Sequence, residues 1–323
     1  MEASKKSQIA KDEIISPAPE AGVCDGGSYN YEDGEREHNR VEGGTLYLVA
    51  TPIGNLADMT YRAVKVLSEV DFVAAEDTRN SGRLLARYGI SKPMVSYHEH
   101  NKASRGAEIA DRLAAGESCA LVTDAGTPGI SDPGEDLVSL CAGRRIPVVP
   151  LPGACAGISA LIVSGLPTSR FCFEGFLPAS GRERRERLAE VAAERRTVIL
   201  HEAPHRLRAT LSDLREAAGG ERRISICREI TKLNEQILRL TLDGAVEYYD
   251  KCEPRGEYVL VLEGAAKSAE TEFWRGLDIA AHVRHYTESG MPERDAVKAA
   301  ARDRGGPKNA VYNEYVRLKK EEK

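Results

Sequence analysis

The 323-residue sequence contains no apolar stretch long enough to cross a membrane. Its longest apolar run, residues 157–163, is interrupted by Ser159, whereas a spanning helix needs roughly 20 apolar residues. The N-terminus has no positive segment followed by an apolar one, and it is acidic, so we expect neither a secretory signal nor a transit peptide. With 41% hydrophobic and 29% charged residues, the composition is typical of a globular protein. We expect a cytoplasmic protein with no membrane partner.

The sequence also lacks paired metal-binding or disulfide motifs. Its seven cysteines are scattered, and none forms a C-x-x-C pair. An odd number of cysteines without metal spacing is typical of free thiols in a reducing compartment. We therefore expect no structural zinc and no other metal.

There is little net charge of either sign. The total is −5, and residues 1–43, with 5 basic and 10 acidic side chains, account for all of it. Those residues are polar and show no apolar period, which predicts a disordered acidic tail. The rest of the chain is not a strongly basic nucleic-acid coat, so any RNA contact must depend on a local patch.

From Thr45 onward, short apolar runs alternate with helical segments. This alternation predicts βαβ units and a mostly parallel sheet. A break at residues 165–167 is followed by five more expected strands, of which the fourth and fifth alternate apolar and polar residues, so we expect the second sheet to be mixed. The sequence thus predicts an α/β fold with an N-terminal domain over 44–165, a second α/β domain over 166–264, and a linker with a helix-turn-helix-like tail over 265–323.

No standard phosphate-binding motif follows the expected strands. The G-x-x-x-x-G-K-[ST] pattern is missing, and no G-x-G-x-x-G follows the first strand. Instead, loops rich in glycine and proline follow three strands, over residues 51–56, 123–134 and 150–155. Tight turns alone would explain one such loop. Three at one sheet edge, where open α/β sheets bind ligands, favour a ligand site.

Several longer motifs, in order along the chain, resemble one family. They are Thr51-Pro-Ile-Gly-Asn-Leu56, Ala75-Glu-Asp-Thr-Arg79, Ser96-Tyr-His-Glu-His-Asn101, Asp124-Ala-Gly-Thr-Pro-Gly-Ile-Ser-Asp-Pro-Gly134, Phe173-Glu-Gly-Phe-Leu-Pro178, Pro204-His-Arg206 and Arg228-Glu-Ile-Thr-Lys232. Residues 44–264 resemble the tetrapyrrole methylase superfamily, in its branch of 16S rRNA (cytidine-2′-O)-methyltransferases. Two positions depart from that pattern: His201 replaces a usual tyrosine, and Ile230 replaces a leucine.

The resemblance implies an enzyme that binds S-adenosyl-L-methionine in a cleft between the two domains. It also implies a homodimer that acts on 16S rRNA in the 30S ribosomal subunit. Carried over by position, the cofactor contacts would come from Pro52, Ile53, Asp124, Gly126, Thr127, Pro128, Ile130, Ala154, Cys155 and Ala156.

Three residues are candidates for removing the proton of a ribose hydroxyl: Lys232, Glu229 and Asp77. Lys232 follows an expected strand, close to Glu229, and a desolvated lysine could lower the pKa of that hydroxyl or accept its proton. The alternative for Lys232 is an ion pair with Glu229 or Glu235. Asp77 belongs to a charged cluster with Glu76 and Arg79, which is either a cleft wall or a helix N-terminus stabilised by its carboxylates.

Six residues are candidates for RNA contacts: Arg79, His98, His100, His205, Arg206 and Arg228. On a strand, His98 and His100 would share a face. That spacing invites a metal site, but no third ligand is apparent, so we favour a polar cleft wall. His205 and Arg206 could hold a phosphate or simply start a helix.

Two other functions remain open at this stage. One is a small-molecule methyltransferase of the same fold, because fold alone does not decide the substrate. The other is a non-catalytic ribosome-binding module. The last residues, 290–323, are too few to hold a core alone. We expect them to pack on another part of the chain or on a partner and, through their basic residues, to contact RNA phosphates.

Overall fold

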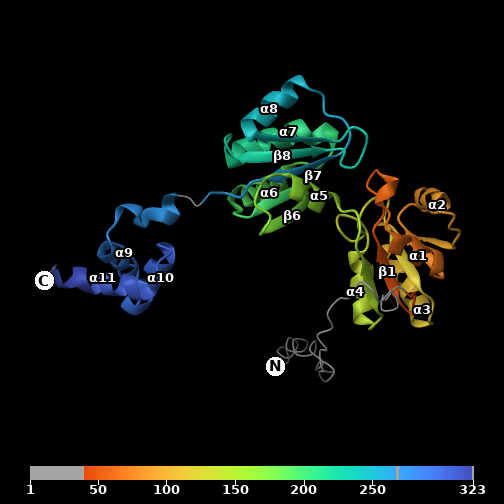
Figure 1. The fold of residues 1–323 in the computed structure, drawn as a ribbon, viewed down its shortest axis with the longest axis horizontal. Helices are drawn as coiled ribbons and strands as arrows, with labels where there is room; N and C mark the ends of the chain where they lie inside the picture. The colour runs from red at the N-terminus through yellow and green to blue at the C-terminus, as the bar shows by residue number, and fades with distance from the viewer. Residues whose placement is uncertain (1–39, 267–268, 322–323) are drawn as a thin grey trace, which may run out of the picture. The chain divides into compact units, whose positions relative to one another are not determined.

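The computed structural model describes residues 40–266 and 269–321 of the chain (Figure 1). The part of the acidic tail predicted over residues 1–43 that precedes Arg40 lies outside the described residues. Among the described residues, no helix is long and apolar enough to cross a membrane.

The first domain is a three-layer α/β unit around a five-stranded parallel sheet, in the strand order β3-β2-β4-β1-β5. Its elements are β1 (Leu46–Val49), η1 (Leu56–Asp58), α1 (Tyr61–Glu69), β2 (Phe72–Ala75), α2 (Thr78–Arg87), β3 (Met94–Ser96), α3 (Lys102–Ala114), β4 (Cys119–Val122), α4 (Glu135–Gly143) and β5 (Val148–Leu151).

Strand alternation divides the core of this domain into two layers. Side chains such as Val49 and Val73 face one layer with Leu67 of α1 and Leu85 of α2. Their neighbours Leu46, Phe72 and Leu121 face the other layer, with α3 and α4. Because helices cover both faces of this sheet, the strand sequences are continuous apolar runs and do not alternate between apolar and polar residues.

The second domain is built on a mixed sheet in the order β6-β7-β10-β8-β9, where only β6 and β7 are parallel. Its elements are α5 (Ala156–Val163), β6 (Phe171–Phe176), α6 (Gly181–Ala193), β7 (Thr197–Glu202), α7 (Pro204–Ala218), β8 (Arg223–Arg228), β9 (Gln236–Thr241), α8 (Leu242–Lys251) and β10 (Tyr258–Leu262). The predicted fold class, a parallel sheet followed by a mixed one, is confirmed.

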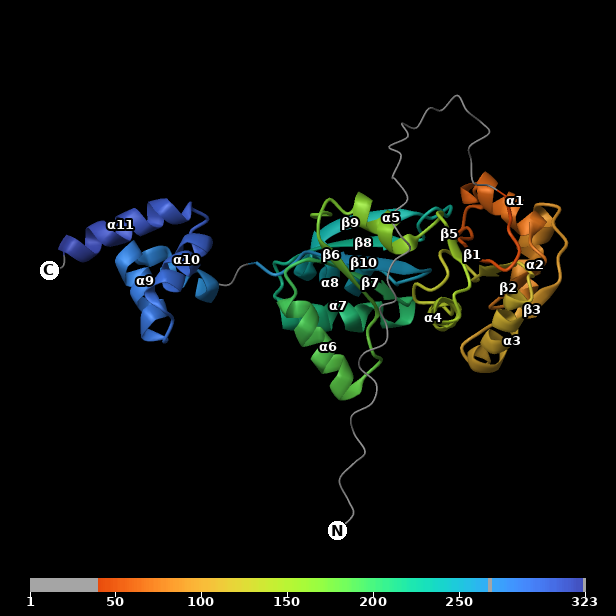
Figure 2. The ribbon, with the colours of Figure 1, turned by 90° about the horizontal axis from the view of Figure 1, so that it is seen from below.

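Helix α5 belongs with the second sheet, although it follows the last strand of the first. Ala160 and Leu161 pack against Ile199 of β7 and against Val259 and Val261 of β10. Helices α6, α7 and α8 cover the opposite face of that sheet (Figure 2). We therefore propose that the domain boundary lies in the segment before Ala156 and not at residue 165.

The segment expected to be a linker, residues 265–287, contains helical structure instead. Here η2 (Ala269–Gly276) and most of α9 (Ile279–Glu288) precede α10 (Glu293–Asp303) and α11 (Lys308–Glu321). The three α-helices share a core that includes Val283, Val297 and Val311. The two predicted tail helices are thus joined by a third, and together the three hold a small core of their own.

Candidate active site

The three glycine- and proline-rich loops come together at the carboxyl edge of the first sheet. Strand β1 lies between β4 and β5, so the loops that follow these strands are neighbours. Thr51 and Gly126 form an isolated antiparallel bridge, with N–H···O distances of 2.9 and 3.0 Å. The Thr51 hydroxyl donates to the Thr123 carbonyl at 3.2 Å, and the Thr127 hydroxyl donates to the Ala154 carbonyl at 3.0 Å. These bonds hold the three loops as one wall.

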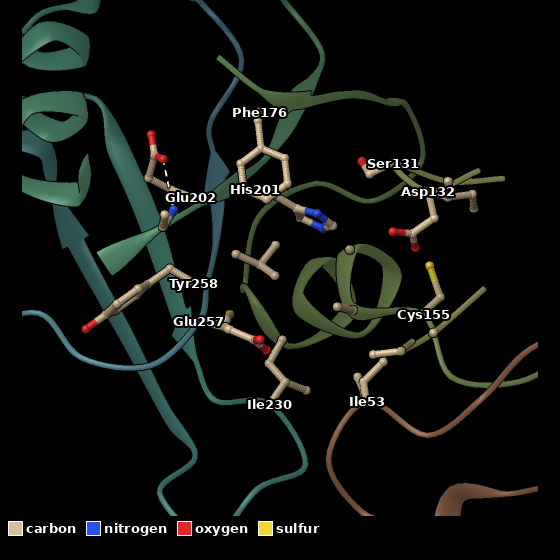
Figure 3. A pocket seen from close by; sticks show the side chains of 18 of the residues that line it. Ile53, Ser131, Asp132, Cys155, Phe176, His201, Glu202, Ile230, Glu257 and Tyr258 are labelled. Carbon is tan, nitrogen blue, oxygen red and sulfur yellow. Dashed lines mark hydrogen bonds between the residues drawn. The ribbon is translucent and has the colours of Figure 1, made fainter. Parts of the chain in front are cut away.

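A cavity of about 330 Å³ opens between this wall and the second domain (Figure 3). It is lined by Ile53, Ala125, Gly126, Thr127, Ile130, Ser131, Asp132, Cys155, Ala156 and Gly157, and across from them by Phe176, His201, Glu202, Ala203, Pro204, Cys227, Ile230, Glu257, Tyr258 and Val259. Its walls contain no lysine or arginine among the described residues. A volume of this size suits a small molecule rather than a polymer.

Most of the predicted cofactor residues line this cavity, but four do not. The six that do are Ile53, Gly126, Thr127, Ile130, Cys155 and Ala156. Pro52 and Asp124 line a smaller cavity instead. Pro128 and Ala154 line neither, and the Ala154 carbonyl accepts the Thr127 hydroxyl.

Gly126 leaves little room for a side chain where the wall faces the cavity. Its φ is +86°, in the region that residues with a Cβ rarely adopt. A Cβ built there would lie 3.3 Å from Cγ2 of Ile53. The loop therefore needs glycine at this position, both for its backbone conformation and for its close packing.

Among the titratable groups of this wall, Asp132 has the pKa that departs most from its ordinary value. Burial raises its pKa to about 6, and the neighbouring carboxylates of Glu76 and Asp124 add to that rise, while a hydrogen bond with Thr123 opposes it. The carboxylate faces the cavity beside Cys155 (Figure 3). A carboxyl group with a pKa near 6 inside a cleft is a candidate for proton transfer.

His201 stands in the opposite wall, at the end of β7. Its ring packs edge-on against Phe173 and Phe176, with centroid distances of 5.1 and 5.5 Å. Burial lowers the pKa of His201, and the charge of Glu257 only partly offsets this. The imidazole is therefore neutral at pH 7. Its buried Nε2 has no hydrogen-bond partner among the described residues, so a polar group is still needed on the cavity side.

Lys232 is held as a cation between Glu229 and Glu257, and Glu257 is one of the residues that line the cavity. Its Nζ lies 2.9 Å from Oε1 of Glu229 and 2.8 Å from Oε2 of Glu257. Burial alone would lower the pKa of Lys232, but its hydrogen bonds with Glu257 and Glu229 outweigh burial and raise it. A lysine with a raised pKa does not accept a proton at neutral pH, so the structure supports a fixed positive charge here.

The Lys232 side chain also crosses to the first domain. A Cβ added to Gly54 would lie 2.3 Å from Cγ of Lys232, so the lysine stem packs directly on that glycine. Glu229 and Thr231 hold the loop in left-handed conformations, with φ of 50° and 69°. Such strained non-glycine residues concentrate at functional sites. The sequence prediction paired Lys232 with Glu229 or Glu235; the structure selects Glu229 and adds Glu257.

Asp77, the third predicted catalytic residue, caps helix α2. Its Oδ1 accepts from the backbone N–H of Arg79 at 2.8 Å, and its Oδ2 lies 2.9 Å from the Arg79 guanidinium. The side-chain hydrogen bond with Arg79, followed by the backbone one, lowers the Asp77 pKa to about 2. Of the two interpretations left open, the helix N-terminus is the one the geometry supports for Asp77.

His98 and His100 lie beyond the end of a strand and therefore do not share a strand face. Strand β3 ends at Ser96, and both histidines lie in the turn before α3. Their rings meet edge-on with centroids 6.0 Å apart, which is contact rather than a shared strand face. No cluster of three or more metal-ligating side chains occurs within residues 40–266 and 269–321.

The guanidinium groups of the predicted RNA-binding arginines of the second domain form hydrogen bonds within the fold. Arg206 donates to the Leu177 and Pro178 carbonyls and lies 3.4 Å from Oε1 of Glu202. Nε of Arg228 donates to the Arg255 carbonyl at 2.8 Å. His205, in contrast, is exposed on the first turn of α7.

The fold and this cavity define a class of two-domain α/β protein. A parallel sheet presents loops at its carboxyl edge, and a second domain with a mixed sheet provides the facing wall of a small-molecule site. Searches against known proteins place the chain within that class. Residues 45–245 match the family Tetrapyrrole (Corrin/Porphyrin) Methylases. The chain belongs to this family and is a methyltransferase.

Curated relatives are similar over nearly their whole length. The chain is 48% identical over 278 residues to the Ribosomal RNA small subunit methyltransferase I of Halalkalibacterium halodurans, covering 85% of this chain and 96% of that protein. It is 47% identical to the protein of the same name from Synechocystis sp., covering 85% and 98%. Among solved structures, a cobalt precorrin-4 methyltransferase superposes with a TM-score of 0.52 at 16% identity, over 68% of this chain and 95% of that one. This last match supports the fold alone.

Proposed function

We propose that this protein transfers a methyl group from S-adenosyl-L-methionine to the ribose 2′-hydroxyl of a cytidine in the 16S rRNA of the 30S subunit. The observation that carries the proposal is the cleft cavity at the carboxyl edge of the first sheet. The high identity to relatives named for small-subunit ribosomal RNA directs the choice of substrate.

The residues around the cavity fit a positively charged sulfonium compound. The described walls present the carboxylates of Asp132 and Glu257 toward the cavity, as Figure 3 shows. The same walls contain no lysine or arginine, and their one histidine, His201, is neutral. The Glu202 carboxylate turns away and accepts from the backbone N–H of Ala203 at 2.9 Å. Apolar side chains such as Ile53 and Ile230 suit the adenosine rings.

When bound, S-adenosyl-L-methionine supplies an activated methyl group on sulfur. The loops after β1, β4 and β5, which are held together by their hydrogen bonds to each other, would bind it through backbone and small side chains. Much of the rate gain then comes from orienting the acceptor hydroxyl in line with that methyl.

The acceptor hydroxyl must lose its proton, and we assign its removal to Asp132. With a pKa of about 6, this group is mostly ionised at pH 7 and is more basic than an ordinary aspartate. Lys232, held charged by Glu229 and Glu257, is placed to stabilise negative charge beside the cavity that Glu257 lines. Asp77 has no part in this assignment.

Binding of the 30S subunit would involve more of the chain than the cleft. We propose that Arg79, whose side chain is 86% exposed although paired with Asp77, and the exposed His205 contact the RNA backbone. The turn that holds His98 and His100 is a further candidate wall for the RNA. By resemblance to the family, we also propose a cytoplasmic homodimer.

The first experiment measures donor binding and transfer together. Calorimetry should show one S-adenosyl-L-methionine bound per chain, and labelled methyl groups should appear in 16S rRNA when 30S subunits are supplied. Binding without any transfer to 30S subunits or to deproteinised 16S rRNA would indicate a small-molecule acceptor. The absence of donor binding would leave only a non-catalytic module.

A further inference from the structure

A second, smaller cavity of about 190 Å³ lies at the same sheet edge. It is lined by Pro52, Gly54, Leu56, Asn80, Ser81, Leu84, Thr123 and Asp124. Two of the three loops that wall the large cavity, those after β1 and β4, also wall this one. Pro52 and Gly54 face the small cavity while Ile53 faces the large one, and Asp124 faces the small one while Ala125 and Gly126 face the large one. The two spaces are therefore separated by little more than backbone.

The small cavity is fixed in shape on its outer side. The Asn55 side chain caps η1 by accepting from the Ala57 N–H at 3.1 Å, and the Tyr88 hydroxyl donates to the Leu56 carbonyl at 2.5 Å. These bonds tie η1 to the end of α2, so Leu56 and Leu84 are held as apolar walls. This slot combines the apolar side chains of Leu56 and Leu84 with the polar side chains of Asn80, Ser81, Thr123 and Asp124.

One polar pair stands in this slot. Nδ2 of Asn80 donates to Oδ2 of Asp124 at 3.2 Å, and both side chains are exposed enough to reach a ligand. The pair offers a carboxylate acceptor beside an amide donor. Cytosine presents the matching edge, an N4 amine donor beside the N3 acceptor, whereas uracil presents an O4 acceptor that a carboxylate repels.

We propose that this small cavity binds the base of the target nucleotide and selects cytosine through Asp124 and Asn80. The proposal rests on the function proposed above, and it moves Asp124 from the donor site to the acceptor site. With the base in the small cavity, the attached ribose would lie beside the dividing loops, next to the large cavity. Reading a base on its Watson–Crick edge in a pocket is how other enzymes that act on extruded nucleotides recognise them.

The test compares methylation of 30S subunits that carry cytidine, uridine or adenosine at the target position. For the unaltered protein we expect kcat/KM to favour cytidine over uridine by on the order of tenfold or more, the usual size for one base contact. Asp124→Asn replaces the acceptor with an amide that can also donate, so the preference should fall to within about threefold. Asn80→Ala should weaken it in the same direction.

Donor affinity and a matched control separate the possible outcomes. Asp111→Asn removes an exposed carboxylate that pairs with Arg144 on another surface of the same domain, and it should leave the cytidine preference intact. The affinity for S-adenosyl-L-methionine should stay within about twofold in all three variants. An unchanged cytidine preference in Asp124→Asn, or a loss of donor affinity, would overturn the proposal.

The failure of the proposed function would look different. In that case the unaltered protein would methylate no nucleotide of the 30S subunit. Efficient methylation of cytidine, uridine and adenosine alike would keep the proposed function and refute only the base subsite.

Discussion

At the scale of single residues, Asp132 carries the assignment of proton removal. Asp132→Asn should lower kcat by on the order of a hundredfold, within the range for loss of a general base. In the unaltered protein, kcat/KM should rise with pH through a step near 6 and then level off, and the variant should lose that step. The pH profiles of kcat and kcat/KM, with Asp111→Asn as the control, measure the loss of rate and the step. An unchanged step in Asp132→Asn would show that another group titrates.

The same substitution should stabilise the fold at neutral pH. The folded-state pKa of about 6 lies above the ordinary value of 3.8, so the folded protein favours the protonated carboxyl. In the unaltered protein, the protonated Asp132 carboxyl stabilises the fold fully at pH values below the ordinary pKa of 3.8. This contribution is lost as the pH rises through 6. Asp132→Asn should therefore melt at a higher temperature than the unaltered protein above pH 6, with the difference shrinking toward pH 4. Equal melting temperatures at pH 8 would argue against a raised pKa of Asp132 in the folded protein.

Gly126 tests the donor site itself. Gly126→Val should abolish S-adenosyl-L-methionine binding, because the branched side chain would press on Ile53 and fill ligand space. Gly116→Val is the matched control. It also carries a positive φ, of +100°, but a Cβ there would meet nothing within 4 Å. Both variants should lose stability, of order 1–3 kcal/mol. A folded Gly126→Val protein with normal affinity would remove this loop from the site.

Sequence patterns located some of these residues and missed others for identifiable reasons. The loops were recognisable because glycine and proline follow expected strands at 51–56 and 123–134. Glu257 was missed because it lies just before β10, far along the chain, and meets Lys232 only in the folded protein. The altered acidity of Asp132 depends on burial and on Glu76, neither of which a local pattern contains.

At the scale of elements, the alternation of strands and helices predicted for the first domain is found there, because its apolar runs are separated by clear turns. Helix α8 has a weaker signal in the sequence. It contains Gly244 and Val246 and follows β9 without a loop, since Thr241 ends the strand and caps the helix at once. Helix α9 had a usable signal in Asp278 followed by apolar residues at 279, 280 and 283, and the capping bond from the Ala281 N–H to Asp278 is formed.

The position of α5 could not be read from local sequence. The chain alternates strands and helices up to residue 163, which is the pattern of one continuous domain. Only packing shows that Leu161 lies against Val261 of the second sheet. Sequence periodicity gives the existence of a helix, whereas the partner of its apolar face depends on long-range contacts.

The C-terminal helices offer an element-scale prediction about RNA binding. Two of the basic residues in this segment are engaged within the fold: Arg304 donates to Nδ1 of His282 at 3.1 Å, and Lys319 pairs with Glu293 at 2.8 Å. Arg302, Lys308 and Lys320 are exposed and remain as phosphate contacts in our proposal. The double variant Lys308→Glu, Lys320→Glu should raise KM for 30S subunits on the order of tenfold. Its effect should shrink as salt increases, because phosphate contacts release counterions.

A truncation checks the same proposal, provided that it removes the helices together. Deleting only residues 290–323 would strip α10 and α11 from α9 and expose their shared core. Deleting residues 267–323 avoids this. The shortened protein should bind S-adenosyl-L-methionine normally and show the raised KM. Normal kinetics on 30S subunits at low salt, in both the truncated and the charge-reversed protein, would show that these helices do not contact RNA.

At the scale of the whole molecule, each domain contributes one wall of a single cleft. The first provides the rigid loops and Asp132, and the second provides His201, Glu257 and the strained loop that carries Lys232. The Lys232 stem on Gly54 is one of the contacts that joins them. A methyltransferase built in this way can serve many acceptors, so the acceptor must be identified by chemistry rather than by fold.

The most direct test of the account is to identify the methylated atom. Purified 30S subunits should be methylated with labelled S-adenosyl-L-methionine, and the 16S rRNA digested to nucleosides and analysed by mass spectrometry. We expect label in 2′-O-methylcytidine, at a single position. Label on a carbon or nitrogen of a base, or in a nucleoside other than cytidine, would contradict it.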